Sequence, residues 1–163
     1  MSTKKPSLKS WLTLPAVRVM DKKEIEANIP HRDPFLLVDE VRILEEGKRC
    51  VGIKKVTGKE YFFKGHFPKA PIMPGVLVLE SISQAFGAAA MAVVSNGHDL
   101  PLFLGVEEAK FRGMVVPGDI LQMPVQILRL GKLSRIYAEA YVNDKLCTQA
   151  QLTFILGDQN LYV

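Results

Sequence analysis

The segment between Val76 and Val94 most constrains how this chain can fold, because apolar residues surround nearly the whole circumference of the helix it would form. A helix that is apolar on almost every side is a buried one, so the rest of the chain has to wrap it. Pro74-Gly75 marks its start and Asn96-Gly97 its end. The run is interrupted by Glu80, Ser81, Ser83 and Gln84, so the sequence predicts no segment of membrane-spanning length.

Strand-like segments make up most of the remaining sequence. Two precede the apolar helix, Phe35 to Leu44 and Cys50 to Val56, and the turn Glu45-Glu46-Gly47-Lys48 joins them. Four follow it: Leu102 to Phe111, Ile120 to Leu130, Ser134 to Val142 and Lys145 to Leu156. Links as short as Pro117-Gly118-Asp119 predict an antiparallel meander. We therefore expect an α+β fold in which an antiparallel β-sheet wraps one long central helix.

The chain has 163 residues, the length of a single domain, which we place at residues 21–163. Residues 1–20 lack sustained periodicity, which predicts a loose N-terminal arm. Next to it, Asp21 is placed to cap a short helix over Lys22 to Ala27, with Glu24 as its capping-box partner. The basic start lacks the apolar run and the cleavage site of a secretory signal, so we expect a cytoplasmic protein.

Charge and cysteine content bound the partners. The net charge of +4 and the pI of about 9.1 favour an acidic partner. Nucleic acid is the weaker interpretation, since no aromatic residues interleave with the basic ones. Cys50 and Cys147 make no disulfide framework and are expected as free thiols. The histidines at 31, 66 and 98 show no metal-ligand spacing, and no nucleotide-binding motif is present, so we predict neither a metal nor a cofactor.

One histidine and one acid carry the chemistry. His66 lies in Gly65-His66-Phe67-Pro68, and Glu80 lies in the second turn of the apolar helix. A lone histidine is structural by default, and Glu80 has an obvious structural partner in Gln84, one turn further on. At Pro74-Gly75, however, the first amides of the helix have no internal acceptors and carry the positive end of its dipole. A base, an acid and such a donor in one segment suit proton abstraction beside a carbonyl with loss of a β-leaving group.

Three ordered blocks of sequence resemble one known family. They are His31-Arg32-Asp33-Pro34-Phe35-Leu36-Leu37-Val38-Asp39; Gly65-His66-Phe67-Pro68 with Pro74-Gly75-Val76, Leu79-Glu80 and Gln84-Ala85; and Ala109-Lys110-Phe111-Arg112 with Val115-Val116-Pro117-Gly118-Asp119. Over roughly residues 22 to 157, the chain is similar to FabZ-type (3R)-3-hydroxyacyl-[acyl carrier protein] dehydratases. The motifs are long and keep their order, so the resemblance is specific.

The resemblance implies a hotdog fold and a homodimer that assembles into a homohexamer, a trimer of dimers. It implies that His66 is the general base at C2 of the acyl thioester, and that Glu80, from the partner subunit, protonates the departing 3-hydroxyl group. The Gly75 N–H would hold the thioester carbonyl, and the carbonyl of Ile72 would orient His66. An apolar tunnel would take the acyl chain, with candidate lining residues Phe67, Pro68, Val76 and Leu79. The substrate would arrive on an acidic acyl carrier protein, and the trans-2-enoyl product would enter bacterial type II fatty acid biosynthesis.

Two features depart from the family pattern. Asp33 stands where the family usually has an aromatic residue, and residues 1–20 have no clear counterpart. The related FabA type, which also isomerises the double bond, carries aspartate at the acid position, so Glu80 favours plain dehydration. Two other functions stay open: a hotdog acyl thioesterase, which attacks the same thioester with water, and a non-catalytic acyl-carrier binding module. The acyl product would serve ordinary fatty acid or lipid A synthesis.

Overall fold

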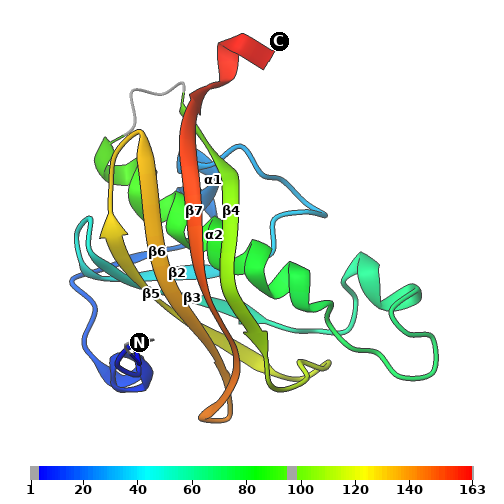
Figure 1. The fold of residues 1–163 in the computed structure, drawn as a ribbon. Helices are drawn as coiled ribbons and strands as arrows, with labels where there is room; N and C mark the ends of the chain where they lie inside the picture. Colours follow the sequence, from blue (N-terminus) through cyan, green and yellow to red (C-terminus); the bar gives the residue numbers. More distant parts are fainter. Residues whose placement is uncertain (1–3, 95–98, 163) are drawn as a thin grey trace.

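The computed structural model of the chain describes residues 4–94 and 99–162, in which a curved antiparallel sheet wraps one long helix (Figure 1). The helices are α1 (Lys22–Asn28) and α2 (Gly75–Val94), with short 3-10 helices η1 (Lys9–Thr13), η2 (Tyr61–Lys64) and η3 (Gln159–Tyr162). The strands are β1 (Arg18–Met20), β2 (Glu40–Glu45), β3 (Arg49–Lys55), β4 (Asp99–Phe111), β5 (Ile120–Arg129), β6 (Leu133–Val142) and β7 (Lys145–Asp158). The α+β fold with a central helix is confirmed.

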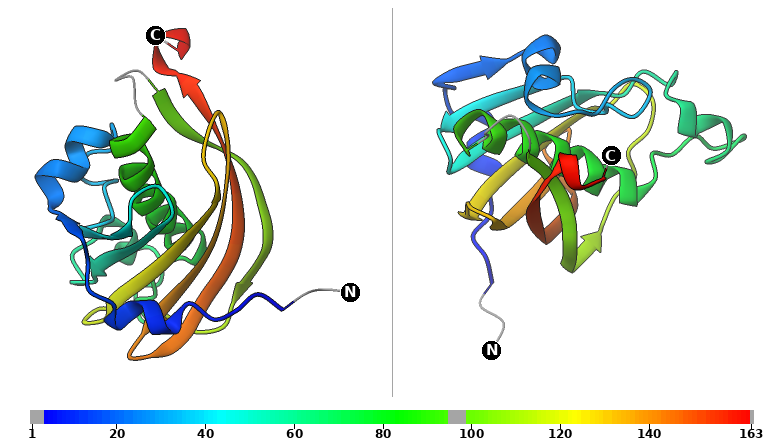
Figure 2. Two further views of the ribbon diagram at one scale, coloured as in Figure 1. Left: turned by 90° about the vertical axis from the view of Figure 1, so that its left-hand side faces the viewer. Right: turned by 90° about the horizontal axis from the view of Figure 1, so that it is seen from above.

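Helix α2 is the core of the molecule, and the sheet curves around it (Figure 2). Ile82 and Phe86 are fully buried, and Phe86 stacks on Phe154 of β7 at 4.7 Å between ring centroids. A Cβ at Gly52 of β3 would lie 2.6 Å from the Ala85 Cβ, so glycine and alanine together let the sheet approach the helix. The Asp21 cap of α1 is also confirmed, since its carboxylate accepts from the Glu24 N–H.

The length of α2 corrects one expectation. By length and composition its 20 residues could cross a membrane, in spite of the polar interruptions. However, 72% of its most apolar window is buried inside the fold, which is typical of the core helix of a soluble protein. The predicted end of the helix, Asn96-Gly97, falls outside the described residues.

The sheet order is β1-β2-β3-β5-β6-β7-β4, so the predicted meander is only partly right. Strands β5, β6 and β7 do follow one another, but β4 pairs with β7, and β5 pairs with β3. The link between β4 and β5 passes the start of α2 instead of turning back. It is held there because the Met73 N–H donates to the Val115 carbonyl and the Val56 N–H to the Asp119 carbonyl.

The strand predicted from Phe35 begins only at Glu40. The Gln84 side chain of α2 takes the place of a neighbouring strand for part of the preceding segment. Its Oε1 accepts from the Leu37 N–H at 2.7 Å, and its Nε2 donates to the Phe35 carbonyl at 2.8 Å. Because those backbone groups are satisfied by the helix, the segment joins no ladder at this point.

The sequence predicted a loose N-terminal arm, but residues 4–20 pack against the sheet. Leu8 and Leu12 are buried, and β1 pairs with β2 in the sheet. Leu12 joins Val51 in a small second apolar cluster. Since Val51 alternates with Gly52, which faces α2, this cluster lies on the face of the sheet away from the helix. A few apolar side chains without helical periodicity are enough to fix the arm.

Strand β4 forms one edge of the sheet, since among the described strands it pairs only with β7. Its exposed side chains include the large apolar residues Phe103, Leu104, Val106 and Phe111. A long, apolar, unpaired edge is a template for pairing with another chain.

Candidate active site

His66 follows η2 in a loop that its own backbone fixes. The Ile72 N–H donates to the His66 carbonyl at 3.0 Å, and the His66 ring Nδ1 lies 2.7 Å from the Ile72 carbonyl oxygen. Because a carbonyl oxygen only accepts, Nδ1 carries the hydrogen, and in the neutral ring Nε2 then has a free lone pair. The contact that an orienting role for Ile72 requires is therefore present. The Phe67 ring stacks on the imidazole at 4.0 Å and is itself 50% exposed.

A pocket of about 320 Å³ lies between this loop, the start of α2 and the end of β4. Its lining comprises His66, Ile72, Met73, Gly75, Val76, Val78, Phe111, Gly113, Met114, Val115 and Thr148. A Cβ at Gly75 would lie 2.7 Å from the Phe111 ring, so a larger residue would have to displace that ring. Glycine at this position thus also serves packing within the chain, in addition to the ligand approach that the sequence suggested.

Glu80 lies on α2 and is half-buried. Its Oε1 accepts a hydrogen bond from Gln84 Nε2 at 2.9 Å and lies 3.4 Å from His31 Nε2. The structural partnership with Gln84 therefore exists, but it engages one carboxylate oxygen. Glu80 is not among the described residues that line the His66 pocket, so one chain does not bring the two groups into one cavity.

The four tunnel candidates fall into two sets. Phe67, Pro68 and Val76 are exposed, Val76 by 68%, whereas Leu79 is buried in the core at 6%. The first three lie at the surface around His66, where a ligand or another chain could cover them. The sequence missed Met114 and Thr148 as lining residues. Met114 lies between the two parts of the third motif block, and Thr148 lies outside every block, so neither was marked by a motif.

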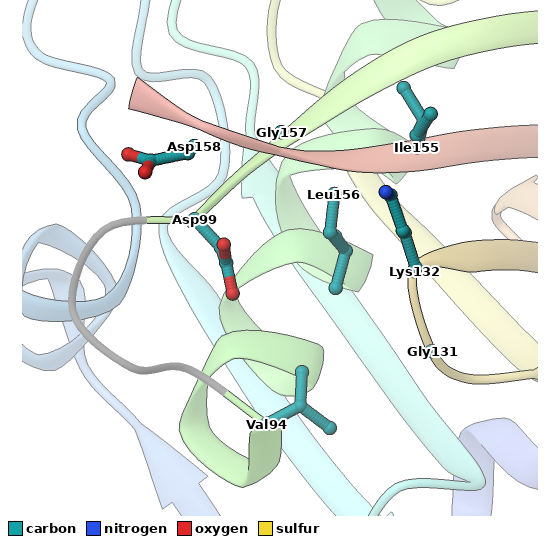
Figure 3. Close-up of a pocket in the computed structure, with 8 residues that line it drawn as sticks. All are labelled: Val94, Asp99, Gly131, Lys132, Ile155, Leu156, Gly157 and Asp158. Carbon is teal, nitrogen blue, oxygen red and sulfur yellow. The ribbon is translucent and has the colours of Figure 1, made fainter. Parts of the chain in front are cut away.

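The larger pocket drawn in Figure 3 lies at the other end of α2. It measures about 570 Å³ and contains Lys132, Asp99 and Asp158 beside the end of the helix at Val94. A rise of 1.5 Å per residue puts this end about 28 Å from Gly75. Its described lining holds no histidine. It also lies far from His66 and the start of α2, so its larger size does not make it the candidate active site.

The two cysteines are not nucleophiles of a second site. Both are buried, and burial raises the pKa of the Cys50 thiol to about 12 and also raises the pKa of Cys147. A reactive thiol needs the opposite shift, toward the thiolate. The sequence-based expectation of free thiols is confirmed.

The unusual Asp33 borders a groove of about 400 Å³ at the side of α1 and η2. Five lysines line this groove: Lys22, Lys54, Lys55, Lys59 and Lys64. Lys54 is buried and paired with Glu60 at 3.4 Å, while the other four are exposed. Asp33 is exposed at this groove, whose lining also includes the acids Asp39 and Glu60, and it stands where an aromatic side chain was expected from the resemblance.

Comparisons with known proteins agree with this geometry. Residues 29–151 match the model of the FabA-like domain. The 3-hydroxyacyl-[acyl-carrier-protein] dehydratase FabZ of Desulforamulus reducens is 45% identical over 86% of this chain and 100% of its own length. The proteins of that name from Clostridium botulinum and Moorella thermoacetica are 43% and 41% identical over 86% of this chain, with 98% and 99% of their own lengths covered.

Solved structures share the fold at low sequence identity. The dehydratase heterocomplex ApeI:P from Xenorhabdus doucetiae matches with a TM-score of 0.71 at 15% identity, over 83% of this chain and 92% of the other. A sigma28-regulated virulence protein from Campylobacter jejuni matches with a TM-score of 0.60 at 12% identity, over 86% of this chain and 93% of the other. At such identity the likeness establishes the hotdog arrangement alone.

Proposed function

Since this chain belongs to the FabA-like family, we propose that it dehydrates (3R)-3-hydroxyacyl-[acyl carrier protein] to the trans-2-enoyl product, in fatty acid biosynthesis. It is a hydro-lyase, like the relatives named FabZ that it matches over nearly their full length. The observation that carries the proposal is His66 itself. Its Nδ1 hydrogen is held by the Ile72 carbonyl, which leaves Nε2 as a base at a pocket that Gly75 also lines.

The proposed reaction needs a base, a charge stabiliser and an acid. His66 Nε2 removes the proton at C2 of the thioester, and the negative charge moves to the thioester oxygen. That oxygen is held by the N–H of Gly75 at the positive end of α2. Glu80 gives its proton to the 3-hydroxyl group, the C3–O bond breaks, and water leaves as the C2–C3 double bond forms. Each positioned acid or base is worth roughly 10² to 10⁴-fold in rate.

Two subunits are needed to assemble this set of groups. Within one chain Glu80 is absent from the described lining of the His66 pocket, while Phe67, Val76 and Phe111 around it are exposed. The edge of β4, next to the same pocket, is also unpaired among the described strands. A second copy that covers this face would bury the apolar side chains and bring its own Glu80 to His66. We take a homodimer as the working unit, and a trimer of such dimers as its assembly.

The carrier protein is the proposed partner, and the lysine-lined groove supports an acidic one. The FabZ relatives are named as dehydratases of 3-hydroxyacyl chains on this carrier. The exposed positions Phe67, Pro68 and Val76 remain candidates for contact with the acyl chain. The relatives and the buried α2 support a soluble enzyme, which we place in the cytoplasm.

The test is to incubate the purified protein with 3-hydroxyacyl carriers of several chain lengths and to follow the products. Formation of the 2-enoyl carrier, absent in His66→Ala, is the expected result. Release of free acid would replace the proposal with a thioesterase. Binding of the carrier without turnover at any chain length would make the protein a binding module.

A further inference from the structure

His31 is the second neighbour of Glu80 and has no role in the proposed reaction so far. It lies in the turn after α1, with its ring stacked on Phe35 at 6.3 Å between centroids and an interplanar angle of 16°. Its Nε2 lies 3.4 Å from Glu80 Oε1. Its Nδ1 is buried and has no hydrogen-bond partner. Among the described residues it is the one buried side-chain nitrogen or oxygen in this situation.

The buried Nδ1 indicates which protonation state His31 adopts. A charged imidazolium would carry a hydrogen on each nitrogen and would bury one N–H at Nδ1 without an acceptor, which is costly. The neutral ring avoids this if its hydrogen is on Nε2, because Nδ1 then presents only a lone pair. In that tautomer the Nε2 hydrogen faces Glu80.

One hydrogen bond and one longer N–H approach then meet at the same oxygen of Glu80. Gln84 Nε2 donates to Oε1 at 2.9 Å, and His31 Nε2 approaches Oε1 at 3.4 Å, a length that contacts in an unliganded site commonly shorten on substrate binding. An oxygen that accepts twice is the carbonyl-type oxygen of a neutral carboxyl group. The transferable proton of Glu80 is thereby directed to Oε2.

We propose that His31 is a positioning residue for the acid Glu80: as a neutral donor it holds Oε1, directs the proton to Oε2 and stabilises the carboxylate that forms when the proton leaves. This rests on the proposed dehydratase function. His31 belongs to the same chain as the Glu80 it holds, so the acid is prepared within one subunit and presented to His66 of the other.

The charged groups around the pair fit a neutral donor. Arg32 is adjacent, but its guanidinium is directed to the backbone carbonyls of Glu26, Ile29 and His31 at 2.7–2.9 Å. On the side of α2, Glu80 is the titratable group in contact with the ring, and Gln84 is uncharged. Phe35 covers one ring face. Among these described contacts, no second carboxylate favours a proton on Nδ1.

The experiment compares two variants of the full-length protein. His31→Phe keeps a ring beside Phe35 but removes both nitrogens, and His31→Gln keeps an N–H donor at about the same reach. We expect kcat for enoyl formation to fall roughly ten- to a hundredfold in the Phe variant, with KM little changed, since hydrogen bonds to charged groups are among the strong ones. We expect the Gln variant to recover most of that loss.

The pH dependence separates positioning from a merely structural role. A donor favours the carboxylate, so its loss in His31→Phe moves the limb of the pH–rate profile that reports Glu80 to higher pH, while the other limb stays. Retention of wild-type kcat in the Phe variant would overturn the inference. An equal loss in both variants, with an unshifted profile, would also overturn it and make His31 structural.

The wild-type protein in the same assay keeps this inference apart from the function itself. Absence of enoyl product from the wild type would refute the proposed function. Turnover by the wild type with an unaffected His31→Phe variant would refute only the role of His31. Thermal unfolding and the oligomeric mass of each variant confirm that the compared proteins are folded alike.

Discussion

Glu80 and Glu139 are two glutamates withdrawn from solvent to different degrees, and their contacts differ. Glu139 lies on β6 and is only 3% exposed. Its Oε1 accepts from the Tyr137 hydroxyl at 2.7 Å, and its Oε2 accepts from the Tyr141 hydroxyl at 2.5 Å and from the Leu8 N–H at 2.8 Å. Glu80 has donors at Oε1 alone among its described contacts. One carboxyl group is engaged on both oxygens, and the other keeps an oxygen available.

The difference teaches how to separate a structural acid from a reactive one. A buried carboxylate that accepts on both oxygens is held in one state and ties segments together; here it fastens the N-terminal arm to the outer face of the sheet. A carboxyl group that is held at one oxygen is oriented and can still exchange a proton at the other. Burial alone would have ranked Glu139 above Glu80.

The largest effect expected from this contrast is on turnover. Glu80→Gln keeps a carbonyl oxygen for Gln84 but removes the transferable proton, so the rate of enoyl formation should fall by roughly 10² to 10⁴-fold. His66→Ala should lose a similar factor by removal of the base. Steady-state rates measure this, with urea unfolding as the control for folding. Near-normal turnover in either variant would contradict the assigned roles.

A change at Glu139 should instead lower stability. Glu139→Ala leaves two tyrosine hydroxyls and the Leu8 N–H without their acceptor, and we expect a loss of about 2–3 kcal/mol in the free energy of unfolding. Glu139→Gln, which retains one acceptor oxygen, should lose less. Urea unfolding gives both values. The kcat of the folded protein should be unchanged, and a large fall in kcat at full folding would mean that the two acids do not divide as described.

The smallest effect concerns stability at alkaline pH. Burial, with the Glu139 carboxylate adding to it, raises the pKa of Tyr141 from 10.0 to about 12 and also raises the pKa of Tyr137. Between these two values the unfolded tyrosine has lost its proton while the folded one keeps it, so the free energy of unfolding should fall as pH rises from about 10 to about 12.

Tyr141→Phe tests the sign of this effect. In this variant the free energy of unfolding should fall less over that pH range, because Tyr141 no longer contributes. Tyr137 and Cys50, whose pKa values are also raised by burial, still contribute the remainder. Denaturant unfolding at a series of pH values measures the slope. An unchanged slope would show that the hydroxyl of Tyr141 is not constrained by Glu139.

The sequence predicted those parts of the fold that depend on local pattern. The apolar circumference of residues 76–94 gave the core helix, and Asp21 gave the cap of α1, because caps and periodicity act over a few residues. The pairing of β4 with β7 was missed, since it is fixed by contacts far apart along the chain. The partnership of Gln84 with Glu80 was predictable, because the two residues are one helical turn apart. The bonds of Gln84 to the backbone at Phe35 and Leu37 were not, because those residues are far away along the chain.

The part of the candidate site that lies within one short segment of sequence was also predictable. His66, Ile72 and Gly75 are close in sequence, and the structure gathers them around one pocket. His31 opens the first motif block, but the block gives it no role in the reaction, because its approach to Glu80 requires the folded chain. The arm anchored by Leu8 gave no periodic signal, because a single N–H bound to a distant carboxylate leaves no pattern in the sequence.

The central claim is that His66 and Glu80 act together from different subunits. Its most direct test is to mix the His66→Ala and Glu80→Gln variants after dissociation and to allow the dimers to re-form. A mixed dimer then contains one site with both groups intact. We predict recovery of about a quarter of wild-type activity, because random exchange gives about half mixed dimers, each with one intact site of two. If the mixture stays as inactive as either variant alone while mass measurements show mixed dimers, the two groups do not work across subunits.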